Sequence, residues 1–178
     1  MEEKPRSALS NGIYYGMIVG AAIIVFSLLL FLMDLHMNKS VSWISYLILC
    51  AGLILGTLDF RKKHSNGFLT YGKAFVSCFW IGLFAGLLAS IFTFVFAKYI
   101  HPGFINEILD QTRASLLEKR PEMTDEQVEQ AVEITAKFVS PPFMALGSVF
   151  MYAGASAILG LILAIFLKKE DPSLNSAM

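Results

Sequence analysis

The feature that most constrains this chain is an uncharged apolar run from Ala74 to Ala97, which lies between Lys73 and Lys98. A helix needs about 20 apolar residues to cross the hydrocarbon core of a bilayer, and this run exceeds that length. An α-helix also satisfies its backbone hydrogen bonds within the segment, as lipid requires. We therefore expect a membrane-spanning helix over about residues 73–98, preceded by a turn at Asn66-Gly67.

Three further runs, about residues 12–33, 41–58 and 143–167, are also uncharged and of similar length. The first competes with a signal peptide, whose apolar region is normally about 7–15 residues and ends at small residues. Here the run is longer and Asp34 follows it, so we expect a retained helix. Because 56% of the residues are hydrophobic, an ordinary soluble domain is excluded. The predicted fold is an all-α integral membrane four-helix bundle, forming a single domain over residues 1–178.

Residues 104–140 are the one sizeable polar segment, between the third and fourth spans. Thr124 and Gln127 have the spacing of a capping box at the start of a helix. Pro102 and Pro141 bracket the segment, and we expect an amphipathic helical hairpin whose apolar faces rest on the span ends, the membrane surface or a partner. The span ends are favoured because the prolines tie the segment to adjacent helices. Apolar residues of the first predicted helix, which Arg120-Pro121 ends, are Phe104, Ile105, Ile108, Leu109, Leu116 and Leu117.

Basic residues near the span ends lie mostly on one side of this topology. By the positive-inside rule that side is cytoplasmic, so both termini are expected in the cytoplasm and residues 99–141 outside. The outward segment carries eight acidic residues against four basic ones, which agrees with this orientation. The cytoplasmic side carries Lys4, Arg6, Arg61, Lys62, Lys63, Lys73, Lys168 and Lys169, whereas the other side carries Lys39 and Lys98 near the spans.

Small residues spaced four apart recur in every span. In lipid there is little hydrophobic drive between helices, so close backbone approach at small residues promotes their association. We predict that these glycines pack the four helices against one another, with homodimerisation through one such face as the alternative. The predicted helix-packing residues are Gly12, Gly16, Gly20, Gly52, Gly56, Gly82, Gly86 and Gly160.

The sequence contains none of the common catalytic or phosphate-binding motifs, such as the zinc-binding His-Glu-x-x-His of metalloproteases, the Gly-x-Ser-x-Gly of serine hydrolases or a glycine-rich phosphate-binding loop. No charged residue or histidine lies in the middle of a span, where proton- and ion-coupled transporters normally place one. We expect no catalytic residue, no cofactor and no metal site, and we expect Cys50 and Cys78 to act as apolar packing residues. The 14 basic and 14 acidic residues balance, so no nucleic-acid partner is expected.

The candidate polar residues lie mainly at the span ends. Asp34 and His36 form either a solvated helix end or a metal or proton site. Asp59, Arg61 and Lys73 either set the orientation of the spans in the membrane or form ion pairs with one another at the span ends. Tyr152 and Ser156 lie deep in the fourth span. We expect their hydroxyls to form hydrogen bonds with the backbone of a neighbouring helix, and the alternative is that they bind a ligand.

Two segments, separated by a glycine-bearing span, resemble the domain-of-unknown-function 4199 family. They are Asn66-Gly67-Phe68-Leu69-Thr70-Tyr71-Gly72-Lys73-Ala74-Phe75 and Tyr99-Ile100-His101-Pro102-Gly103-Phe104. The resemblance covers nearly the whole chain. It implies a small four-span protein of a bacterial inner membrane, and it brings no activity and no catalytic residue. We expect a non-enzymatic structural or accessory protein that binds lipid or a membrane partner. The alternative is a small transporter or channel subunit, and a membrane enzyme is the third possibility.

Overall fold

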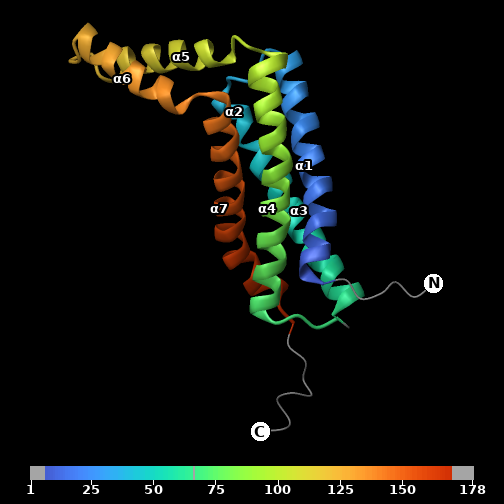
Figure 1. Ribbon diagram of the computed structural model, residues 1–178. Coiled ribbons are helices and arrows are strands. Elements are labelled where there is room, and N and C mark those ends of the chain that lie inside the picture. Colours follow the sequence, from blue (N-terminus) through green and yellow to red (C-terminus); the bar gives the residue numbers. More distant parts are fainter. Residues whose placement is uncertain (1–6, 66, 170–178) are drawn as a thin grey trace. The chain divides into compact units, whose positions relative to one another are not determined.

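The computed structural model describes residues 7–65 and 67–169, except for the side chain of Lys39 (Figure 1). Lys4 and Arg6, which contribute to the predicted orientation, and Asn66 of the predicted turn lie outside the described residues. The helices in chain order are α1 (Ala8–Leu32), α2 (Lys39–Ser42), α3 (Ile44–Asp59), the π-helical η1 (Phe60–His64), α4 (Tyr71–Val95), the π-helical η2 (Phe96–Ile100), α5 (Phe104–Lys119), α6 (Asp125–Phe138) and α7 (Pro141–Leu167).

The predicted all-α fold is confirmed, with four helical segments that are long and apolar enough to cross a membrane. Their bounds are Ala8–Leu32, Ser40–His64, Tyr71–Ile100 and Pro141–Leu167. The first begins four residues before the predicted Gly12, because the Ser7 side chain caps it by accepting a hydrogen bond from the Ser10 amide at 3.2 Å. The second runs past the predicted Leu58 because α3 continues without a break into η1.

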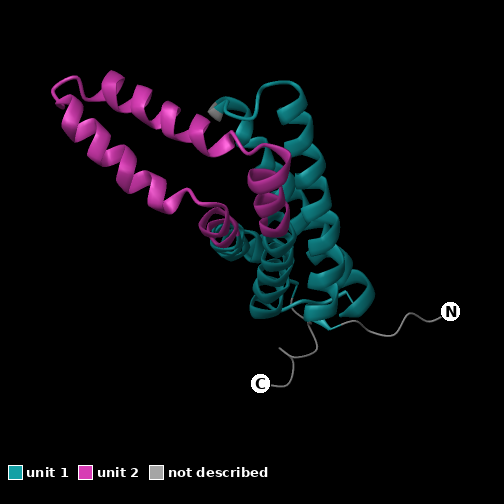
Figure 2. Ribbon diagram, turned by 45° about the horizontal axis from the view of Figure 1, so that its top comes forward, with its two compact units in different colours: residues 1–89, 149–178 teal, residues 90–148 magenta. Residues whose placement is uncertain are grey.

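The chain forms two compact units, residues 1–89 with 149–178, and residues 90–148 (Figure 2). In the first unit, α1, α3 and most of α4 and α7 lie side by side as a four-helix bundle (Figure 1). Its interior is filled by a cluster of apolar side chains from all four helices. The buried members are Val19, Ile23, Leu49, Leu53, Cys78, Ile81, Ala85 and Leu167.

We call one end of the bundle the basic end, because it carries Arg61, Lys62, Lys63, Lys73, Lys168 and Lys169. Contacts at this end join segments that are far apart in the sequence. Leu69 and Lys169 form an antiparallel bridge, with backbone N–O distances of 2.7 and 2.8 Å. Leu69 is buried there, and the Lys169 ammonium lies over the Phe68 ring. Gly67 makes the preceding turn with a φ of +83°, a conformation that glycine adopts without strain. The segment before α4 is therefore held against the end of α7.

The second unit contains the hairpin of α5 and α6, which pack against each other (Figure 1). The predicted capping box is confirmed. Thr124 Oγ1 accepts a hydrogen bond from the backbone amide of Gln127, and Gln127 Oε1 accepts one from the backbone amide of Thr124. The Arg113 guanidinium of α5 donates to the Glu129 carboxylate of α6 at 2.7 Å. Pro141 begins α7, two residues before the predicted span, because the φ angle of proline suits the first position of a helix.

Candidate functional site

The glycines of α1 all face α4. A Cβ atom placed on Gly12 would collide with Trp80, and the same change at Gly16 or Gly20 would press on Phe84 or Leu88. Both sets of residues are spaced by four, so one row of glycines on α1 accommodates one row of large side chains on α4. Residues four apart lie on the same face of a helix, which is why the two rows match along their length.

The other predicted packing glycines also contact helices of the same chain. Gly52 and Gly56 of α3 face Val19 and Tyr15 of α1. Gly82 and Gly86 of α4 face α7 at Ser156, Tyr152 and Val149, and Gly160 of α7 faces Cys78 and Phe75 of α4. By contrast, Gly154 of α7 has open space around it. Gly56 also faces Ile81 of α4, so the glycine surfaces lie at four helix–helix contacts within the bundle: α1 with α4, α1 with α3, α3 with α4, and α4 with α7.

Uncharged polar groups are buried between the helices, an arrangement that sequence reasoning missed. The Asn11 amide nitrogen of α1 donates to the Gly56 carbonyl of α3 at 3.0 Å. Thr57 of α3 donates to the Ser77 hydroxyl of α4 at 3.3 Å and lies 3.3 Å from Cys78 Sγ. Asn11, Thr57 and Ser77 are all fully buried. Each sits near the end of an apolar run, so it looks like an ordinary boundary residue until the helices are brought together.

Asp34 ends α1 in a left-handed conformation, with a φ of 54°. The Leu35 amide donates to the Leu30 carbonyl, and the Asp34 amide donates to the Phe31 carbonyl. This is the hydrogen-bond pattern of a Schellman motif, in which the left-handed residue is usually glycine. Aspartate adopts this conformation occasionally, because its short polar side chain can hydrogen-bond locally. The side chain of Asp34 is exposed, so its role in this structure is to end a helix.

At the basic end, Asp59 and Arg61 hold separate structural contacts. The Asp59 carboxylate pairs with the Lys63 ammonium at 2.9 Å. The Arg61 guanidinium donates to the Leu167 carbonyl at 3.0 Å, at the C-terminal end of α7. A cation at this position is stabilised by the carbonyl dipoles of the last helical turn. Lys73 is exposed at the start of α4, and the structure does not bring it into these contacts.

Tyr152 of α7 is half-buried, and its ring lies against that of Tyr46 on α3, with centroids 6.4 Å apart. We predicted that Ser156 would bond a neighbouring helix backbone, and this is wrong. Its hydroxyl donates to the Ala153 carbonyl of α7 itself at 2.9 Å. A serine can reach the carbonyl of its own preceding turn, which satisfies the hydroxyl without a partner helix.

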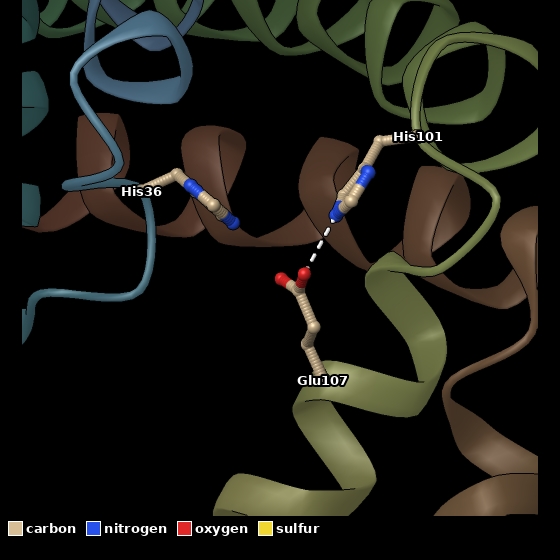
Figure 3. A group of neighbouring side chains, drawn as sticks. All are labelled: His36, His101 and Glu107. Carbon is tan, nitrogen blue, oxygen red and sulfur yellow. Dashed lines mark hydrogen bonds and ion pairs between the residues drawn. The ribbon is translucent and has the colours of Figure 1, made fainter.

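Two of the three histidines, His36 and His101, differ in their local contacts. His36 lies in the connection between α1 and α2, where its ring contacts Phe31 with centroids 5.5 Å apart. His101, directly after η2, interacts through Nε2 with the Glu107 carboxylate of α5 at 2.9 Å (Figure 3). Phe104 and Phe96 pack against the His101 ring. The His101–Glu107 pair therefore braces the turn between η2 and α5.

A comparison with family models gives a match over residues 14–169 to the protein of unknown function family DUF4199. The chain belongs to this family. The match covers most of the first span, the other three spans in full and the α5–α6 hairpin, as the resemblance noted in the sequence implied. Neither the curated proteins nor the solved structures contain a match. Membership in DUF4199 supplies a family and no activity.

Proposed function

We propose that this DUF4199 protein is a non-enzymatic accessory protein of a membrane, which binds a membrane partner through its α5–α6 hairpin. The filled interior of the bundle carries this proposal. Leu49, Leu53 and Ile81 are fully buried at its centre. The buried polar residues of the described chain are Asn11, Thr57, Ser77 and Ser156, all uncharged. Ion- and proton-coupled transport normally relies on ionisable groups at depth.

The hairpin supplies the surface for a partner. Glu126 and Glu133 lie on the exposed side of α6, and neither has an ion pair within the described residues. Asp125 and Glu126 also stabilise the first turn of α6 through the helix dipole. An acidic surface of this kind favours a partner with basic residues near the membrane, because complementary charge speeds and orients association.

A small transporter or channel subunit is the second candidate function. The buried Asn11 amide favours it, because its Oδ1 atom has no hydrogen-bond partner within the described part of the chain. A buried carbonyl oxygen without a partner is uncommon and often marks a bound water or ion. The nitrogen of the same side-chain amide donates to the Gly56 carbonyl at 3.0 Å.

Photo-crosslinking in intact membranes tests the accessory function. We expect benzoylphenylalanine at Glu126 to form a discrete adduct with another membrane protein. We expect Glu133→Lys to reduce that adduct several-fold through charge repulsion, whereas Lys137→Gln on the same helix should not. An adduct that survives the charge reversal, or no adduct at all, would argue against the proposal. Potassium release from proteoliposomes that is abolished by Asn11→Leu would replace it with the second candidate.

For the orientation, we propose a bacterial inner membrane with the basic end and both termini in the cytoplasm. Arg61, Lys63 and Lys73 support this because basic residues near span ends are retained on the cytoplasmic side. We expect fluorescent-protein fusions after Lys63 and Lys169 to be fluorescent and an alkaline-phosphatase fusion after Glu122 to be active. Phosphatase activity from a fusion after Lys63 or Lys169 would reverse the topology.

A further inference from the structure

The second unit exposes a row of large apolar side chains that continues from α6 onto α7. The exposed fractions are 58% for Ile134 and 66% for Phe138 on α6, and 54% for both Phe143 and Leu146 on α7. Ile134 and Phe138 are one turn apart and therefore share a face of α6. We call these four residues the α6–α7 stripe.

The two halves of the α6–α7 stripe meet at a ring contact. The centroids of Phe138 and Phe143 lie 6.3 Å apart, and the ring planes are inclined by 76°. This edge-to-face arrangement is a favourable geometry for aromatic pairs. Only Val139 and Ser140 separate the two helices in sequence, so the contact and the short connection keep Phe138 close to the first turn of α7.

The depth of α7 in the bilayer then determines what Phe138 contacts. The helix has 27 residues, which corresponds to about 40 Å at a rise of roughly 1.5 Å per residue. The hydrocarbon core is only about 30 Å thick, so the first turn of α7 falls at the boundary between acyl chains and headgroups. An exposed Phe143 ring at that boundary would face lipid, and Phe138 lies against this ring.

We propose that Ile134 and Phe138 insert into this lipid boundary, so that the second half of α6 is an interfacial membrane anchor. Amphipathic helices bind a bilayer surface through buried apolar area, and most add basic residues that attract anionic lipid. Here the exposed Glu126 and Glu133 repel anionic lipid. The covalent connection to α7, rather than electrostatic attraction, keeps α6 close to the bilayer surface. A tethered group experiences a high effective concentration at its site, so a small apolar stripe is enough.

The inference relies on the insertion of α7 in the bilayer and not on the accessory function. It can be tested on the full chain with single cysteines in a Cys50→Ser, Cys78→Ala background. An environment-sensitive nitrobenzoxadiazole label is placed at Ile134→Cys or Phe138→Cys, with Glu126→Cys and Glu133→Cys as controls on the acidic side of the same helix. Each labelled protein is selected as a monodisperse species and reconstituted in phosphatidylcholine nanodiscs.

We expect the labels at positions 134 and 138 to emit at shorter wavelength than the controls. A lipid with a nitroxide near its headgroup should quench them several-fold more than the controls, and aqueous iodide should quench them several-fold less. Equal iodide quenching at all four positions would overturn the proposal by showing that α6 is in water. Protection from both quenchers at 134 and 138 would also overturn it, because protein, such as a second copy of the chain, would then cover the stripe.

Discussion

Replacing Gly82 and Gly86 together by leucine is expected to unfold the bundle at temperatures that the unmodified protein withstands. A Cβ atom at Gly82 would collide with Cβ and Oγ of Ser156, and one at Gly86 would lie 3.0 Å from Cβ of Tyr152. Atoms this close to the α7 backbone cannot rotate away, so the two helices must separate. Overpacking typically costs about 1–3 kcal/mol per site, which gives roughly 2–6 kcal/mol for the double variant.

Thermal unfolding of the detergent-solubilised protein measures this loss. Gly154→Leu is the matched control, because it adds the same side chain to α7 at a position surrounded by open space. A sharper test pairs Gly82→Ala with Ser156→Gly, which removes the atoms that the new methyl group would strike. We expect the second change to restore part of the stability lost in the first. If the leucine variant melts like the unmodified protein, α4 and α7 do not make this contact.

Truncating Leu53 to alanine is expected to give the second-largest loss of stability. Its side chain is fully buried in the core cluster of the bundle. In soluble proteins the same change costs about 2–5 kcal/mol, part of which is the transfer of apolar groups from water. That part is small where lipid is the surrounding solvent, so the remaining cavity and dispersion terms predict a cost of roughly 1–3 kcal/mol.

Leu55 on the same helix provides the control, since this residue is 62% exposed. We expect Leu55→Ala to change the midpoint of denaturant-induced unfolding in mixed micelles very little, and Leu53→Ala to lower it clearly. Equal effects at both positions would mean that α3 does not present Leu53 to the interior. A larger effect at Leu55 would indicate that the face exposed in the monomer is covered by a partner.

The sequence by itself determined the features that depend on neighbouring residues. Uncharged runs of about the length of a bilayer crossing specify the four spans, because a helix in lipid needs only its own backbone to satisfy its hydrogen bonds. The capping box at Thr124 and the proline at residue 141 mark where α6 and α7 begin, because those signals act within one helical turn. The family resemblance was carried by such local segments as well.

Only the tertiary structure decided which helix faces meet. Every span carries small residues spaced four apart, so the pattern alone does not distinguish a contact of α1 with α4 from one of α1 with α7. Arg61 bonds the carbonyl of Leu167, which is 106 residues away, and Asn11 bonds the carbonyl of Gly56. Backbone carbonyls are present at every position and leave no mark in the sequence. These pairings arise from the packing of the helices in space, which local patterns constrain but do not specify.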